Sequence, residues 1–250
     1  MKHFKRLLMT TFFFMVIFGC GEGKENGIIS PAPDEDGAKK WMLVFEDNFE
    51  NKTVNTAEWS MYNSSGHIGN GLRRPEAFSI ENGLLVVTAQ MKDGQLVSGG
   101  MAHKRSYKYG RFEFRVRTEA DPDNATGGVV LTWPTNENWP TDGELDIYET
   151  GTATSRNPFH TFIHYGKNND QLHFIHEADG KEWHTMMCEW LPDAIRIYRD
   201  GAVVYTENQS VTVPKVEHHL CIQLDAFKTS MTGTVRMYVD WVKIYQQTKD

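Results

Sequence analysis

The sequence predicts an all-β protein built as a sandwich or barrel of antiparallel strands. Three observations support this prediction. Short apolar segments recur from Trp41 onward, Gly-containing turns separate them, and no window of about a dozen residues shows a sustained helical period of apolar positions. Asp-Gly and Asn-Gly turns are typical of hairpins, which join antiparallel neighbours.

Each expected strand is a short apolar run of alternating or continuous character. In chain order these strands are Leu84–Ala89, Gly110–Val116, Val129–Trp133, Thr161–His164, Ala194–Tyr198 and Val235–Tyr245. The turns expected between strands are Asn82-Gly83, Asp93-Gly94, Asp179-Gly180 and Asp200-Gly201. Charged and apolar residues alternate strictly from Arg111 to Arg117, which predicts one buried face and arginines in solvent.

The composition narrows the function classes. The chain has 250 residues, 40% of them hydrophobic, which suits one large domain with a sizeable core, and it shows no internal repeat. Its net charge of −7 argues against nucleic acid or an anionic membrane as the partner. Seven Trp and nine Tyr suit a carbohydrate ligand, because sugar rings have apolar C–H faces that stack on aromatic side chains.

The N-terminus has the pattern of a targeting signal. A basic start precedes the apolar run Leu7–Phe18, which is too short to span a bilayer. The run is followed by Gly19-Cys20, which resembles the end of a bacterial lipoprotein signal, where the cysteine is lipid-modified after cleavage. We expect a signal peptide over residues 1–19 and lipidation of Cys20, with a plain secretory signal as the alternative.

These assignments divide the chain into three parts. Residues 20–40 are rich in Gly, Glu, Lys, Pro and Asp and are expected to form a flexible tether, and residues 41–250 form the functional domain. The protein is expected to be exported and lipid-anchored at a bacterial cell envelope or cell surface, or else secreted. Cys188 and Cys221 both lie in apolar runs, where they either pair or remain buried thiols.

The segment Glu144–Glu149 places three carboxylates within six residues of an expected strand. Strand alternation sends Glu144 and Asp146 to one face and Glu149 to the other. A β-bulge, which adds one residue to a strand, would bring all three to the same face. Such a group serves proton transfer or cation binding, and the structural alternative is a solvated polar strand face.

The segment Glu144–Glu149 resembles the signature of glycoside hydrolase family 16 in its longer, bulged form, as in laminarinases, agarases and κ-carrageenases. The resemblance extends over residues 41–246 in family order. Further matching segments are Phe45–Phe49 with Trp59, Ser98–Met101, Tyr109–Glu113, Trp183–Trp190, Pro192–Gly201 and Val239–Tyr245. The resemblance implies a β-jelly-roll sandwich of two antiparallel sheets whose concave sheet forms a substrate cleft.

The resemblance also implies roles for individual residues. Glu144 is the nucleophile, Glu149 the acid/base, and Asp146 hydrogen-bonds Glu144. The implied substrate-binding residues are Trp133, His164, Trp139, Arg73 and Trp190, of which Trp133 and Trp190 could instead be core residues. Gln223 is a weaker candidate, because strand alternation directs it to the same sheet.

No cofactor is expected to be required. Many relatives hold a structural Ca²⁺, and Glu46 and Asp240 resemble those ligand positions. The sequence therefore predicts a monomeric, surface-anchored, retaining endo-β-glycanase whose partner is a polysaccharide, first of all a β-1,3- or β-1,3-1,4-glucan. The alternatives are a transglycosylase, a galactan hydrolase acting on agarose or carrageenan, and a non-catalytic glycan-binding protein.

Overall fold

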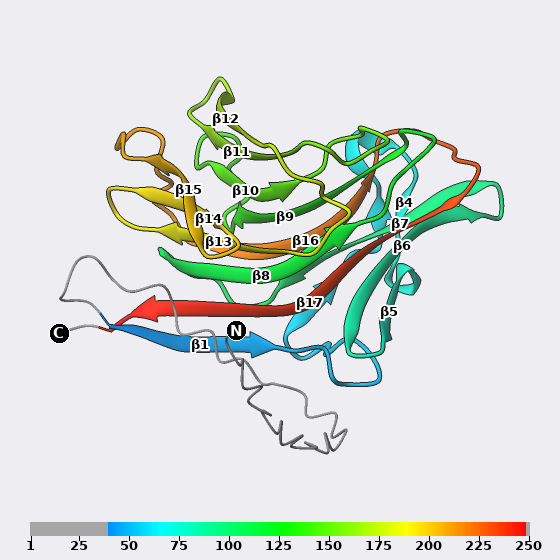
Figure 1. The fold of residues 1–250 in the computed structure, drawn as a ribbon, viewed down its shortest axis with the longest axis horizontal. Helices are drawn as coiled ribbons and strands as arrows, with labels where there is room; N and C mark the ends of the chain where they lie inside the picture. Colours follow the sequence, from blue (N-terminus) through cyan, green and yellow to red (C-terminus); the bar gives the residue numbers. More distant parts are fainter. Residues whose placement is uncertain (1–39, 249–250) are drawn as a thin grey trace, which may run out of the picture. The chain divides into compact units, whose positions relative to one another are not determined.

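The computed structural model describes residues 40–248, and these residues form an antiparallel β-sandwich (Figure 1). The predicted signal peptide, Cys20 and nearly all of the tether lie outside the described residues. Within the described part of the chain, no helix has the length and apolar character needed to cross a membrane.

One layer, which we call the back sheet, is organised around the long strand β17. In order of pairing its strands are β5 (Phe78–Glu81), β6 (Leu84–Lys92), β17 (Thr234–Gln247), β8 (Gly110–Thr118), β13 (His184–Trp190), β14 (Ile195–Arg199) and β15 (Ala202–Glu207). The first half of β17 pairs with β6, and its second half pairs with β1 (Trp41–Asp47).

The other layer, which we call the cleft sheet, contains the candidate site. In order of pairing its strands are β2 (Trp59–Met61), β7 (Gln95–His103), β16 (His218–Ala226), β9 (Thr126–Pro134), β10 (Glu144–Glu149), β11 (Phe159–Tyr165) and β12 (Asp170–His176). The start of β7 also pairs with β6, so this strand joins the two sheets. The chain between β2 and β5 forms β3 (Ser64–Ser65), the 3₁₀ turn η1 (His67–Gly69), β4 (Leu72–Arg73) and the 3₁₀ turn η2 (Pro75–Ala77).

The core lies between the two sheets and confirms the predicted alternation. On β8, Phe112, Phe114 and Val116 are completely buried, and they belong to the same apolar cluster as buried residues of β9 to β11 and β16. All six expected strands are present, each within or overlapping an observed strand. Cys188 and Cys221 are free, buried thiols on different sheets, so they do not pair.

All four predicted turns lie between strands. Both residues of Asn82-Gly83, Asp93-Gly94 and Asp200-Gly201 have positive φ, as two-residue hairpin turns of type I′ require. Asp179-Gly180 begins a turn in the connection from β12 to β13, in which the Glu182 amide donates to the carbonyl of Asp179 at 3.0 Å. This turn does not close a hairpin, because β12 pairs with β11 and β13 pairs with β8 and β14.

Candidate active site

A β-bulge in β10 brings the three acidic side chains to one face of the cleft sheet. Asp146 pairs with Leu131 of β9, whereas Tyr148 pairs with Val130, so that Ile147 is an extra residue in β10. The pairing of β10 with β11 shifts over the same segment. The bulge predicted from the sequence is therefore confirmed.

The two faces of β10 have different surroundings. Leu145, Ile147 and Tyr148 are buried in the core between the sheets. All three acids line a cleft of about 1120 Å³, in which Glu144 is 8% exposed and Asp146 is 3% exposed. The acids thus stand at the bottom of the cleft, largely shielded from water.

Burial is the main cause of raised pKa values in this trio. It raises the pKa of Glu149 to about 7, with a further rise from the charge of Asp225. Burial, and then the charge of Asp146, raises the pKa of Glu144 to about 9. Burial and the charge of Glu149 raise the pKa of Asp146 well above its ordinary value. Because Glu144 and Asp146 are hydrogen-bonded to each other, the protonation of one acid depends on that of the other.

Trp139 contacts the acids directly. Its indole Nε1–H donates a 2.7 Å hydrogen bond to Oε2 of Glu144. Its ring lies nearly parallel to that of Trp133, with the centroids 5.8 Å apart and an angle of 14° between the planes. Trp133 in turn donates to Glu137 at 2.8 Å. Both tryptophans line the cleft, as predicted, and Trp139 touches the acid trio as well as the rim.

His164 of β11 lies on the opposite side of the trio from β9. Its Nε2 is 3.0 Å from Oδ2 of Asp146, and its Nδ1 is 2.8 Å from Oδ1 of Asn169. These two contacts fix the orientation of the imidazole. The sequence predicted His164 as a substrate-binding residue, and the structure gives it a direct contact with Asp146.

Arg73 also reaches the cleft, where it is paired with an acid. Its Nε and Nη2 donate to Oδ1 of Asp225 at 3.1 and 2.6 Å, and its guanidinium lies over the ring of Tyr62. Arg74 turns away and donates to the carbonyl of Ser64. Of the two neighbouring arginines, Arg73 is therefore the one available to a bound sugar.

The prediction that Trp190 binds substrate was wrong. Trp190 ends β13 on the back sheet and is completely buried, so no sugar can reach its ring. Its indole packs against Phe112, Tyr109 and His218 and donates to the carbonyl of Pro214. Trp190 is a core residue, which was the alternative left open by the sequence.

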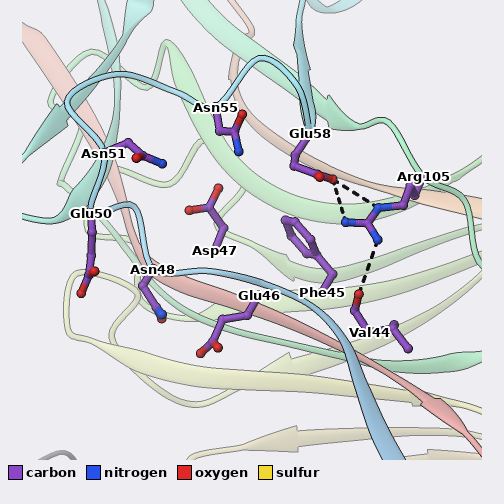
Figure 2. A pocket seen from close by; sticks show the side chains of 10 residues that line it. All are labelled: Val44, Phe45, Glu46, Asp47, Asn48, Glu50, Asn51, Asn55, Glu58 and Arg105. Atoms are coloured by element: carbon purple, nitrogen blue, oxygen red, sulfur yellow. Dashed lines mark hydrogen bonds and ion pairs between the residues drawn. The ribbon is translucent and has the colours of Figure 1, made fainter.

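A smaller cavity of about 450 Å³ lies beside β1 and the loop that follows it (Figure 2). Two of its acidic side chains have hydrogen-bonding or ionic partners beside the cavity. Asp47 accepts hydrogen bonds from the amide of Phe49 and the indole of Trp59, while Glu58 pairs with Arg105 at 2.8 Å. Figure 2 shows the Glu58–Arg105 pair at one side of this cavity. These contacts hold the loop that follows β1 in place.

The structure does not support a calcium ion held by Glu46 and Asp240. Glu46 lies 3.4 Å from Nζ of Lys243, and Asp240 accepts a 2.5 Å hydrogen bond from Arg115. Each carboxylate is matched by a cation of the back sheet, so the pair does not fit a shared Ca²⁺ site. Among the residues that the structure describes, the cluster with metal-ligand spacing is Glu144 and Asp146 with His164, whose ligand atoms lie within 4.8 Å of one another.

Several cleft residues were not identified from the sequence. Phe162 and Asp225 each lie two positions from a named candidate on the same strand, so alternation could have found them. Tyr62 and Phe227 come from segments outside the strands, where no periodic signal exists. Gln223 does line the cleft, and its buried Oε1 has no hydrogen-bond partner in the described part of the protein.

A protein-family model and proteins of related sequence both match this chain. The sequence model of the family "Glycosyl hydrolases family 16" matches residues 69–243. A β-glucanase of Acetivibrio thermocellus is 28% identical over 185 residues, which cover 72% of this chain and 53% of that protein. A β-glucanase of Rhodothermus marinus is 26% identical over 253 residues, covering 87% of this chain and 81% of that protein.

The fold also matches a solved structure. The catalytic domain of an endo-1,3-β-glucanase (laminarinase) from Thermotoga petrophila RKU-1 superposes with a TM-score of 0.73 at 19% identity, covering 85% of this chain and all of that one. This match confirms the predicted two-sheet jelly-roll sandwich. The chain spans about half the length of the A. thermocellus relative, 53% of it.

Proposed function

Because the chain belongs to glycosyl hydrolase family 16, we propose that it is a retaining endo-β-glycanase acting on a β-1,3- or β-1,3-1,4-glucan. The observation that carries the proposal is the acid trio on one face of a bulged strand, at the bottom of a cleft. Retaining hydrolysis uses two carboxyl groups about 5–5.5 Å apart, one as nucleophile and one as acid/base.

In the first step, a Glu144 oxygen attacks the anomeric carbon and forms an ester with it as the glycosidic bond breaks. Glu149 transfers its proton to the departing oxygen, and its raised pKa keeps that proton available near neutral pH. In the second step, the Glu149 carboxylate takes a proton from water, and the resulting hydroxide displaces Glu144 at the anomeric carbon. Configuration is retained because the carbon is attacked twice.

The neighbours of Glu144 prepare it for attack. The Trp139 N–H stabilises negative charge on Glu144, since a hydrogen bond to a charged acceptor is stronger than one to a neutral acceptor. Glu144 must attack as a carboxylate, so in the reactive state Asp146 is the protonated partner and donates the hydrogen bond between the two acids. His164 contacts the other side of Asp146 and holds it in place.

The charge of the cleft favours a neutral substrate. Its lysine and arginine residues are Lys104, which donates to the carbonyl of Thr56, and Arg73, which is paired with Asp225. Five carboxylates line the same cleft. A sulfated galactan would be repelled by this surface, so the alternative of a carrageenan hydrolase is disfavoured. The named β-glucanase relatives support a glucan as the substrate.

The proposal also includes export and a lipid anchor on Cys20. Its support is the sequence pattern of a basic start, an apolar run and Gly19-Cys20. An enzyme tethered in this way would shorten polysaccharides at the cell envelope. Mass spectrometry of the N-terminal peptide of the mature protein tests this part: an acylated cysteine supports it, and an unmodified Cys20 or a different mature N-terminus contradicts it.

The activity is tested by measuring release of reducing ends by residues 21–250 beside Glu144→Gln. The substrates are laminarin, barley mixed-linkage glucan, agarose and κ-carrageenan. We expect activity on a glucan that is lost in the variant. Binding of a glucan without any turnover by the wild-type protein would instead indicate a non-catalytic glycan-binding protein.

A further inference from the structure

Two histidines face each other on β11 and β12, the last two strands of the cleft sheet. Nε2 of His173 on β12 lies 3.0 Å from Nδ1 of His160 on β11. His160 pairs directly with Ile175, so His173 is its diagonal neighbour, a position from which long side chains can meet. By contrast, His184 and His218 contact carboxylate, carbonyl or hydroxyl oxygens.

The separation of the two nitrogens suits shared ligation of one metal ion. Imidazole nitrogens bind Zn²⁺ at about 2.0–2.1 Å, so two of them at an angle of about 90–110° lie about 2.9–3.4 Å apart. The observed 3.0 Å falls within this range. Without an ion, one of the two nitrogens carries a proton and donates it to the other. A metal ion can replace that proton while both rings stay neutral, each with its proton on the outer nitrogen.

Phe162 holds the two imidazoles in this arrangement. The rings of Phe162 and His173 are stacked, with their centroids 4.3 Å apart and 9° between the planes. His160 packs against the same phenylalanine, with a centroid distance of 5.9 Å. The two strands pair without a bulge from Phe159 to Tyr165. Because both rings are already packed, binding an ion would cost little further side-chain entropy.

The surroundings leave the pair available to a cation. His173 is exposed and His160 is partly exposed, so an ion can enter with water as its remaining ligands. Burial, and then the charge of His173, lowers the pKa of His160 from its ordinary value of 6.5, and the charge of Glu177 acts in the opposite direction. His160 is therefore neutral at pH 7, as a metal ligand must be. Glu177 adds a carboxylate whose charge favours a cation nearby.

We propose that His160 and His173 form a binding site for a divalent transition-metal ion, Zn²⁺ or Ni²⁺, with water in the remaining coordination positions. Imidazole nitrogen suits these ions, whereas Ca²⁺ and Mg²⁺ take oxygen ligands. The ion ties β12, the last strand of the cleft sheet, to β11. Through the stack of His173 on Phe162, it also fixes a side chain that lines the cleft. The site is independent of the proposed hydrolysis.

The test is calorimetric titration of Zn²⁺ and of Ni²⁺ into the full chain without an added histidine tag, beside His160→Gln and His173→Gln. We expect each variant to bind the ion at least roughly 10-fold more weakly than the wild type, since even changes behind the ligands lower metal affinity 10–100-fold. The ion should also raise the melting temperature of the wild type more than that of either variant, because a ligand of the folded state stabilises it. The matched control is Ile175→Ala, which removes a 44% exposed apolar side chain next to His160 and should leave the metal affinity unchanged.

The acid trio offers a competing site, because Glu144 and Asp146 form a three-residue cluster of metal-ligand spacing with His164. His164→Gln distinguishes the two sites. Binding that is kept in His164→Gln and weakened in the His160 and His173 variants would support the proposal. Binding that survives unchanged in both of those variants, or no binding of either ion by the wild type, would overturn it. Either result would leave the proposed hydrolase function intact, since reducing-end release measures that function separately.

Discussion

Glu189 of the back sheet and Glu144 of the cleft sheet are both buried carboxylates on β-strands, but their neighbours differ. Glu189 is 3% exposed and accepts hydrogen bonds from Arg111 at 2.7 Å and Arg196 at 2.6 Å. Glu144 is 8% exposed, and its partners are an indole and a second acid. Among the described residues, no lysine or arginine forms an ion pair with Glu144.

This difference separates a structural acid from a reactive one. For a buried carboxylate with two guanidinium partners, the cost of leaving water is offset by the matched charges and their hydrogen bonds. A buried carboxylate beside another acid has a raised pKa, and its negative charge is not neutralised by a lysine or arginine. Residues with identical side chains in the same fold therefore serve opposite purposes.

The largest effect is expected from Glu144→Gln. The amide cannot form the ester with the anomeric carbon, so turnover of the glucan substrate should fall by roughly 10⁴-fold or more. The variant keeps the shape of the side chain and removes a crowded acid, so its free energy of unfolding should be unchanged or higher. Reducing-end release and urea denaturation measure the two quantities.

Azide distinguishes the role of Glu144 from that of Glu149. In Glu144→Ala, azide can enter the space of the missing nucleophile and give a product of inverted configuration. In Glu149→Ala, azide would attack the glycosyl ester on Glu144 and give a product of retained configuration. The same product from both variants would contradict the assignment of the two acids.

Glu189→Gln is expected to lower the free energy of unfolding and to keep the activity, which is the opposite of the result expected from Glu144→Gln. This variant removes the charge of Glu189 from its pairs with Arg111 and Arg196, and removing one partner of a buried pair destabilises a protein by about 3–5 kcal/mol. Activity per folded molecule should be preserved, because Glu189 does not line the cleft. A loss of stability below ~1 kcal/mol, typical of surface pairs, would remove the contrast with Glu144.

Local patterns were sufficient to predict most of the fold. The alternation within β8 predicted its buried face, and the hairpin turns follow from residues that accept positive φ. The prediction that the arginines of β8 are merely solvated was wrong for Arg111, which is buried against Trp41 and paired with Glu189. That pairing joins β8 to β13, which is distant in sequence, so no local pattern reveals it.

The limit of local sequence patterns also explains which residues of the candidate active site were predicted correctly. The acid trio lies within one strand, so its spacing predicted both the bulge and the shared face. Trp190 lies on a strand whose sheet could not be assigned from alternation, since alternation defines two faces without saying which of them meets the core. Phe227 depends on the absence of a side chain at Gly127, across the sheet, which the sequence does not indicate.

A smaller effect is expected from Trp139→Phe, which tests whether the indole N–H supports Glu144. Phenylalanine keeps most of the stacking on Trp133 and removes the hydrogen bond. Hydrogen bonds to charged groups contribute about 1.5–3 kcal/mol, so kcat should fall roughly 10- to 100-fold. The matched control is Trp133→Phe, which removes the bond to Glu137 and should change KM more than kcat. Equal losses of kcat in both variants would indicate that stacking alone matters.

The smallest expected effect is the pH dependence that the raised pKa of Glu149 gives to stability and to kcat/KM. The pKa of Glu149 rises from its ordinary value of 4.5 to about 7, so the folded protein holds this proton more tightly than the unfolded chain between these values. The stability that Glu149 contributes is therefore present at low pH and lost as the pH rises through about 7. For the same reason, kcat/KM should fall about tenfold per pH unit above that point, because the departing oxygen needs the proton. A glucan oligosaccharide with a nitrophenyl leaving group, which departs without a proton, should not show this alkaline limb. In Glu149→Gln, the free energy of unfolding should no longer depend on pH over this range. If kcat/KM for the nitrophenyl substrate still fell at alkaline pH, the titrating group would be a residue other than Glu149.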